Sequence, residues 1–311
     1  MLEIHVDKQN GDFSTITEAI WAVPYDTEAV IYIGEGTYRE KIFSDKRAIS
    51  FIGAGMDKTI LEYGDGAFDD MEDGTKRGTF RSFTAFFGGH RAVVKDMTIR
   101  NTAGDGAKAG QALAVYADAD YCHFENVKLE GHQDTLFLSP LPEKERQKNG
   151  FLGPRVLSPR VLTRQYYKGC EIRGDVDFIF GGADAVFEDC LITCNHRPDN
   201  GGINGYITAA SGKKDGLGFV FMNCRIRGEE GCKPGSVFLG RPWRDEARTV
   251  FLDCDMDESI SPKRFSGWGD VDKEHPDTFY GEYGEVKSIG VSEYIQLVER
   301  AKDHIEDVIS Y

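Results

Sequence analysis

One segment places two aspartates among apolar, strand-forming residues. In Gly174–Gly181 the aspartates Asp175 and Asp177 alternate with valine, phenylalanine and isoleucine. Strict alternation would put Asp177 and Ile179 on one face of a strand and Phe180 on the other. An ionised carboxylate between such neighbours is costly to desolvate unless a partner holds it. The segment alone also fits an ordinary aspartate at a turn, so both interpretations stay open.

A second segment has the same character, because Asp134 follows Gln133 in another β-prone run. Brought together with Asp177, Gln111 and Arg241, these residue types fit ester hydrolysis. An ionised aspartate oriented by a cation can attack an ester carbonyl. A second carboxyl with a raised pKa can protonate the departing alcohol, and amides can stabilise the oxyanion. Pairs of acids also serve glycosidases, so the residue types leave the reaction open.

The elements that must bring these residues together are short strands punctuated by Gly, Asn and Asp, with no long helical pattern between them. A weak repeat consists of an aromatic residue, two mostly polar or small residues, and then an apolar residue that is usually Cys. Such units predict a stacked solenoid, here a single-domain all-β parallel β-helix in which the cysteines pack internally. The repeat occurs at Phe124–Val127, Tyr167–Cys170, Phe187–Cys190, Phe221–Cys224 and Phe251–Cys254.

Three further segments complete the predicted domain of residues 1–311. Within an N-terminal cap of residues 1–28, Thr15 and Glu18 fit a capping box that opens a short helix. Residues 291–309 predict an amphipathic helix packed along the solenoid, with Ser292 as a candidate N-cap. Residues 139–164 form a basic, proline-rich insertion that is either a solvated loop or a functional one.

Composition narrows the class of protein. The 311 residues carry a net charge of −15, which argues against nucleic acid as a partner. No run of about 18 apolar residues is present, so no membrane segment is predicted. The seven cysteines are scattered without a Cys-x-x-Cys motif. They predict no metal site and a reduced, cytoplasmic protein, with secretion as the alternative if a signal peptide has been removed. We also expect a monomer.

Several motifs in chain order resemble the pectin methylesterase (pectinesterase) family over residues 5–285. The resemblance implies a right-handed parallel β-helix that removes methyl esters from galacturonate units of pectin or its oligomers, without metal or cofactor. The motifs are Gly11–Ile20, Gly53–Gly55, Asn101–Gly104, Gln111–Val115, Gly131–Leu136, Gln165–Tyr167, Asp175–Gly181, Ile207–Ala209, Leu239–Trp243 and Gly267–Trp268.

The resemblance also implies a role for each matching residue. By position, Asp177 corresponds to the nucleophile and Asp134 to the general acid and base. Gln111 and Gln133 correspond to the oxyanion donors, and Arg241 to the arginine that orients the nucleophile.

Three further positions match the family's substrate cleft: Trp243, and more weakly Thr79 and Phe180. Two positions depart from the family. Asp175 stands where threonine is frequent, and His132 stands where an aromatic residue is common, so we interpret His132 as a loop or subsite residue. The basic insertion also lengthens the interval between the two acid motifs, and we expect it to contact free carboxylates of the substrate.

Two other functions remain as alternatives. One is a glycosidase or lyase built on the same solenoid, since paired acids also suit those reactions. The other is a solenoid that binds pectin without catalysis.

Overall fold

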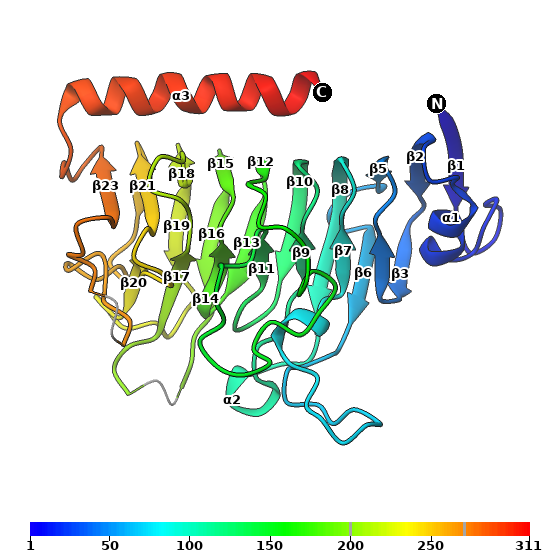
Figure 1. Cartoon of the computed structure of the whole chain (residues 1–311), viewed down its shortest axis with the longest axis horizontal. Helices are drawn as coiled ribbons and strands as arrows, with labels where there is room; N and C mark the ends of the chain where they lie inside the picture. The colour runs from blue at the N-terminus through cyan, green and yellow to red at the C-terminus, as the bar shows by residue number, and fades with distance from the viewer. Residues whose placement is uncertain (199–200, 270–271) are drawn as a thin grey trace.

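Parallel strands stacked coil upon coil dominate the computed structural model, which describes residues 1–198, 201–269 and 272–311. Figure 1 shows the strands side by side along the long axis of the molecule. The first face follows the path β1 (Leu2–Val6), β2 (Glu28–Ile33), β5 (Ala48–Ile52), β8 (Arg91–Asn101), β10 (Tyr121–Glu130), β12 (Arg164–Lys168), β15 (Asp184–Glu188), β18 (Phe219–Met222), β21 (Arg248–Leu252) and β23 (Phe279–Tyr283).

The second face belongs to the same sheet, because β8 and β10 run through the bend between the two faces and pair with strands on both. Its other strands are β3 (Gly36–Arg39), β6 (Thr59–Tyr63), β13 (Glu171–Gly174), β16 (Leu191–Cys194), β19 (Arg225–Gly228) and β22 (Asp255–Met256).

The third face is a separate, shorter parallel sheet, and it carries the candidate site. Apolar side chains from all three faces meet in one continuous core inside the coils. Together the faces confirm the predicted parallel β-helix. The third face consists of β4 (Ile42–Ser44), β7 (Ala85–Phe87), β9 (Val115–Ala117), β11 (Leu136–Leu138), β14 (Val176–Gly181), β17 (Gly205–Ala210) and β20 (Val237–Gly240).

The repeated aromatic position forms a ladder through the core. The Tyr167 ring lies 4.9 Å from Phe124 and 4.6 Å from Phe187, and the stack continues to Phe221 at 4.5 Å and Phe251 at 4.6 Å between centroids. These separations match the spacing of neighbouring strands, ~4.8 Å. The ladder therefore follows from one in-register aromatic residue in each coil.

The repeat also explains the bend that follows its aromatic residue. Its third residue has a positive φ, for example 53° at Asn126, 55° at Asp189 and 54° at Asn223. Asn, Asp and Gly tolerate this conformation better than other residues. The cysteine that follows turns inward, and Cys170, Cys190 and Cys224 are fully buried free thiols while Cys254 is partly buried. The predicted internal packing role of these thiols is confirmed.

Helices protect one end and one side of the solenoid (Figure 1). Helix α1 (Ile16–Ala22) packs on β1, β2 and β4. As predicted, the Thr15 hydroxyl accepts from the Glu18 N–H at 3.2 Å and donates to the Glu18 carboxylate at 2.7 Å. Helix α3 (Val291–Ser310) lies along the outside of β10, β12 and β15. The N-cap prediction was wrong, because Ser292 already lies within the helix and Gly290 is the extended cap residue.

Candidate active site

All eight residues selected from the sequence line one cleft on the third face. They are brought together by the stacking of coils, since they come from five separate stretches of the chain. The cleft has a volume of about 240 Å³. Its predicted lining residues are Thr79, Gln111, Gln133, Asp134, Asp177, Phe180, Arg241 and Trp243.

The two acids occupy equivalent positions on successive coils. Leu136 of β11 pairs with Ile179 of β14, and each aspartate lies two residues before its member of this pair. Both aspartates have a positive φ, 66° at Asp134 and 51° at Asp177. Non-glycine residues in this region are uncommon and cluster at functional sites.

The alternation predicted for the Asp177 segment was wrong. Between Val176 and Ile179 the register of β14 against β17 shifts, which is a β-bulge centred on Asp177. As a result, Asp177 and Phe180 both face the cleft, while Ile179 and Phe178 join the interior core. The bulge aims the carboxylate outward without interrupting the strand.

Arg241 follows β20 and holds Asp177 with two hydrogen bonds. Its Nε donates to Oδ1 at 2.8 Å and its Nη2 to Oδ2 at 2.6 Å. The guanidinium lies between two aromatic rings, 4.0 Å from the Tyr206 centroid and 4.4 Å from that of Trp268. A bidentate contact fixed by stacking on both sides leaves the carboxylate little rotational freedom.

Burial and charge act differently on the two acids. Burial raises the pKa of Asp177, but the hydrogen bonds and charge of Arg241 oppose this shift. Burial raises the pKa of Asp134 well above its usual range, and the negative charge of Asp177 adds to the effect. Two neighbouring carboxyls do not readily ionise together, so this environment favours the charged form at Asp177 and the protonated form at Asp134.

The two glutamines stand at the same rim of the cleft. Gln111 precedes β9, and its backbone carbonyl accepts from the Ala67 N–H at 2.8 Å. Gln133 accepts through its carbonyl from Ala112 at 3.1 Å, which ties the two glutamine segments together. In the described part of the chain the side-chain amide of Gln111 has no hydrogen-bond partner, so it is available to a ligand in the cleft.

Aromatic side chains form the wall of the cleft beside the acids. The Trp243 ring lies 5.6 Å from Phe180 and 6.1 Å from Phe151, in edge-to-face contacts. Thr79 begins the short 3₁₀ helix η1 (Thr79–Arg81), whose Phe80 packs in the same cluster. Flat apolar surface beside polar groups is the usual composition of a small-molecule or sugar site.

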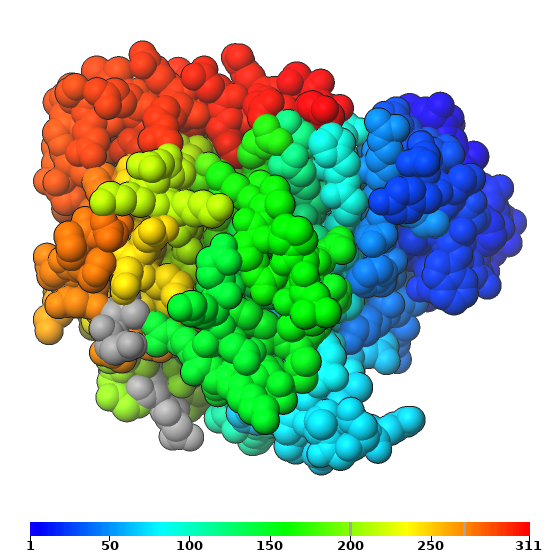
Figure 2. Space-filling view, in the orientation of Figure 1, coloured from blue at the N-terminus to red at the C-terminus, as the bar shows by residue number. Residues whose placement is uncertain are grey.

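The sequence prediction missed several lining residues. Trp268 was noted only as part of a motif, and nothing in the sequence indicated that it stacks on the guanidinium of Arg241. The other missed residues include four from the basic insertion, which lies across the middle of the face shown in Figure 2. The missed lining residues are Phe80, Arg146, Gln147, Gly150, Phe151, Ala209, Arg244 and Trp268.

The basic residues of the insertion do not share one role. Arg155 binds Asp118 at 2.6 Å, and Arg164 binds Asp120 at 2.6 Å, so both hold the insertion on the solenoid. Arg160 donates to four backbone carbonyls of the insertion itself. Arg146 instead lines the cleft, where its Nη2 donates to the Trp243 carbonyl at 3.1 Å and its guanidinium lies 5.4 Å from the Trp268 centroid.

Comparison with known proteins decides the family. A family model described as Pectinesterase matches residues 4–147 and 160–299. The chain belongs to the pectinesterase family. Probable pectinesterase/pectinesterase inhibitor 64 of Arabidopsis thaliana is 37% identical over 97% of this chain and 49% of its own length. Pectinesterase 31 of the same plant is 32% identical over 87% of this chain and 78% of its own. The chain thus spans about half the length of the first of these pectinesterases.

Solved pectinesterase structures share the fold. The carrot pectin methylesterase superposes with a TM-score of 0.74 at 31% identity, over 92% of this chain and 84% of its own. The enzyme of Yersinia enterocolitica gives 0.73 at 28% identity, over 91% and 96%. The pectinesterase family model leaves residues 148–159 unmatched, and these lie inside the predicted insertion.

Two other kinds of feature are absent from residues 1–198, 201–269 and 272–311. No three His, Cys, Asp or Glu side chains gather there in an arrangement suited to a metal ion. None of the helices in those ranges combines the length and hydropathy that a membrane crossing requires.

Proposed function

We propose that this pectinesterase-family chain hydrolyses the methyl esters of galacturonate units in pectin or its oligomers and releases methanol. The observation that carries the proposal is the pair of buried acids on successive coils, one held by Arg241 and the other with a pKa that burial raises. A mutant of a related pectin methylesterase, 27% identical to this chain, has been solved with a hexasaccharide bound. That enzyme's ligand supports a sugar chain as the occupant of the cleft.

The geometry suits a two-step mechanism. The Asp177 carboxylate attacks the C6 ester carbonyl, and the amides of Gln111 and Gln133 donate to the oxyanion that forms. Collapse of this intermediate breaks the bond to the methoxy oxygen, which takes the proton of Asp134 and leaves as methanol. Asp134 then removes a proton from water, which attacks the acyl-enzyme. The product leaves as a carboxylic acid, which gives its proton to solvent, while Asp177 is regenerated as a carboxylate and Asp134 is again protonated.

We also propose substrate-binding roles for the other residues that line the cleft. Trp243 and Phe180 provide the apolar surface for the sugar rings, and Thr79 borders the same space. Arg146, together with Arg244, places positive charge at the rim, where a free carboxylate of a partly de-esterified chain would bind. The single-domain organisation, the monomeric state and the cytoplasmic location stay predictions.

The test is methanol release from defined methylated oligogalacturonates. Wild type should release methanol and leave the chain length unchanged, whereas Asp177→Ala should release none above background. Asp189→Asn is the control, because Asp189 has a similar φ of 55° but lies exposed, outside the cleft.

Other outcomes would identify the alternatives. New reducing ends or unsaturated products without methanol would indicate a glycosidase or lyase. Binding of pectin that survives Asp177→Ala, with no methanol from wild type, would indicate a non-catalytic solenoid. Methanol release that is unaffected by Asp177→Ala would refute the proposed mechanism.

A further inference from the structure

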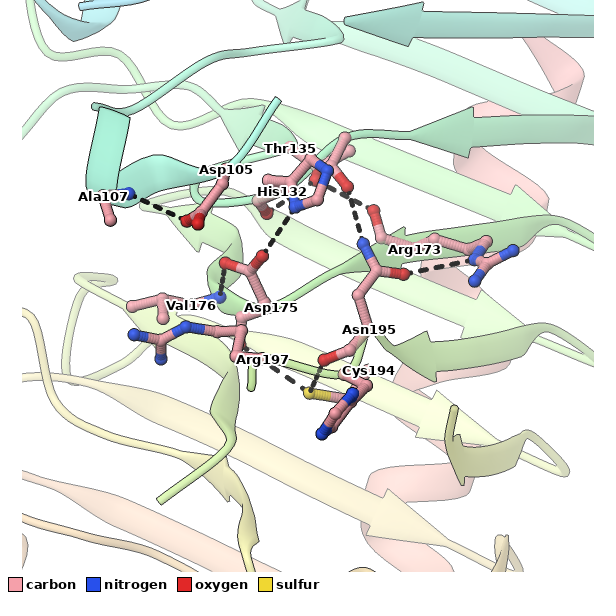
Figure 3. A network of polar contacts seen from close by, with 12 residues as sticks. Asp105, Ala107, His132, Thr135, Arg173, Asp175, Val176, Cys194, Asn195 and Arg197 are labelled. Carbon is pink, nitrogen blue, oxygen red and sulfur yellow. Dashed lines mark hydrogen bonds and ion pairs between the residues drawn. The ribbon is translucent and has the colours of Figure 1, made fainter. Parts of the chain in front are cut away.

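His132 and Asp175 form a contact directly beside the two acids. Each lies two residues before an acid, His132 before Asp134 and Asp175 before Asp177. Figure 3 shows the two side chains pointing toward each other, and His132 Nδ1 lies 2.9 Å from Asp175 Oδ2. Neither residue lines the cleft described above, so neither is placed to touch the reacting ester.

This contact belongs to a set that fastens one acid-bearing segment to the other. The Asp175 N–H donates to the His132 carbonyl at 3.1 Å, and the Asp134 N–H donates to the Val176 carbonyl at 3.0 Å. The second carboxylate oxygen of Asp175 accepts from the Val176 N–H at 2.8 Å. The Asp175 side chain therefore connects the backbone just before Asp177 with the imidazole just before Asp134.

The backbone around His132 is held from its other side as well. Thr135 Oγ1 donates to the carbonyls of His132 at 3.1 Å and Arg173 at 2.9 Å. Asn195 Nδ2 donates to the Gly131 carbonyl at 2.8 Å. Figure 3 shows this network converging on the His132 segment from neighbouring coils. With the backbone fixed in this way, the imidazole has a defined position opposite Asp175.

The two side chains differ in exposure, 38% for His132 and 2% for Asp175. A buried carboxylate requires a partner, and the imidazole is the side chain that supplies one. The hydrogen bond to Asp175 raises the pKa of His132 and favours its charged form. The charge of Asp175 in turn raises the pKa of both Asp134 and Asp177.

Other charged groups also face the imidazole. Asp105, at the start of α2 (Gly106–Ala109), and Glu229 both act on His132 and raise its pKa further. The remaining charged or titratable groups share a cavity with it and come from the second face and the segments that follow it. They are Arg100, Glu130, Arg173 and His196.

We propose that His132 and Asp175 are a positioning pair for the esterase site, which fixes the segment carrying Asp134 against the segment carrying Asp177. The inference rests on the proposed function. It replaces the expectation that His132 is a loop or subsite residue. It also gives a single reason for the two departures from the family pattern, because the two unusual residues contact each other.

The test compares kcat and KM for methanol release across four variants. His132→Ala should lower kcat between about ten- and a hundredfold with KM changed less than about twofold, because the acids are misplaced but the cleft is intact. His132→Asn keeps an N–H donor at the position of Nδ1 and should restore most of kcat. His90→Ala is the matched control, since His90 is 39% exposed and 4.0 Å from the carboxylate of Asp120.

Asp175→Asn separates charge from geometry and is the mildest change to the fold. It keeps an acceptor for His132 and should retain kcat at its optimum within about threefold. Because it removes a negative charge near both acids, both limbs of the pH–rate profile should move to lower pH. This shift also decides the question if His132→Ala does not fold.

Several results would overturn the pair. A raised KM with unchanged kcat in His132→Ala would mean that His132 is a subsite residue. Equal losses of kcat in His132→Ala and His132→Asn would mean that the hydrogen bond between His132 and Asp175 does not support catalysis. An unshifted pH–rate profile in Asp175→Asn would also overturn the proposed pair. In each case wild type still releases methanol, so the proposed function stands. Absence of methanol from wild type would overturn both.

Discussion

Replacing Arg241 should remove the orientation and the ionised state of Asp177 together. The guanidinium makes both hydrogen bonds to a carboxylate that is 3% exposed, and Tyr206 and Trp268 fix its plane. Arg241→Gln removes the charge, whereas Arg241→Lys keeps the charge but offers a single point donor instead of a planar fork. The two variants therefore separate charge from geometry.

The size of the effect follows from burial. Breaking a buried ion pair leaves an uncompensated charge, at a cost of about 3–5 kcal/mol. At 1.36 kcal/mol for each factor of ten, the ionised fraction of Asp177 should fall between about a hundredfold and several thousandfold in Arg241→Gln. Arg241→Lys should lose one charge-assisted hydrogen bond, about 1.5–3 kcal/mol, which lowers the rate by about ten- to a hundredfold.

The assay is the pH dependence of kcat/KM for methanol release. In Arg241→Gln both limbs should move to higher pH, because Arg241 lowers the pKa of both acids; the acid limb should move further, since Asp177 also loses two hydrogen bonds, so the optimum narrows as it shifts. Arg39→Gln is the control, because Arg39 also binds a carboxylate through Nε, at 2.9 Å from Glu62, but lies exposed. An unchanged acid limb and rate in Arg241→Gln would refute the assignment of Asp177 as the nucleophile that Arg241 orients.

Three further predictions concern stability and specificity. Burial raises the pKa of Asp134 above its unfolded value, so the stability that this carboxyl contributes falls as pH rises from about 4 through the folded-state pKa. Asp134→Asn should therefore raise the melting temperature at pH 7, and it should reduce methanol release at least about a hundredfold. Arg146→Gln should raise KM for partly de-esterified oligomers about fivefold (~1 kcal/mol) but not for fully methylated ones, and Lys148→Gln should change neither; equal effects on both substrates would contradict a carboxylate contact. Phe187→Ala should lower the free energy of unfolding in urea by about 3–5 kcal/mol, against less than about 0.5 kcal/mol for exposed Leu157→Ala; similar values for both would argue against the aromatic ladder as part of the core.

Much of the fold could be predicted because the coils repeat. The aromatic residue and the cysteine of each unit must face inward for a solenoid to have a core, and the ladder from Phe124 to Phe251 confirms this. The capping box at Thr15 could also be predicted, since it depends only on two residues that are three positions apart. Local chemistry and short-range periodicity are properties that a sequence displays directly.

The placement of the site residues had a different origin. The residue types alone were compatible with both an esterase and a glycosidase. The resemblance of the ordered motifs to the family selected the site residues, which are Gln111, Gln133, Asp134, Asp177 and Arg241. The structure brings all five to one cleft. Alternation failed at Asp177 because a β-bulge depends on the neighbouring coil, which the pattern of a single segment does not contain.

Contacts between distant side chains were the least predictable part. Trp268 stacks on the guanidinium of Arg241, and His132 meets Asp175 across a whole coil. In each case the residues are far apart in sequence, and their partner is set by the register of stacked coils. The roles of the basic residues in the insertion could not be predicted for the same reason. Arg155 binds Asp118 whereas Arg146 lines the cleft, and only the fold determines which groups lie opposite each of them.

The solenoid positions the two acids independently of most other residues of the cleft. Asp134 and Asp177 hold the same position on successive coils, so their spacing is set by the rise of the helix, about 4.8 Å per coil, and not by loop conformation. Apart from Phe180 and Ala209, the other groups that line the cleft come from segments outside the strands, among them η1, the insertion with Arg146, and Trp268. Changes in length or charge of those segments alter the cleft without moving the acids. We therefore expect the basic insertion, which the family model leaves partly unmatched, to affect the choice of substrate more than the proposed reaction.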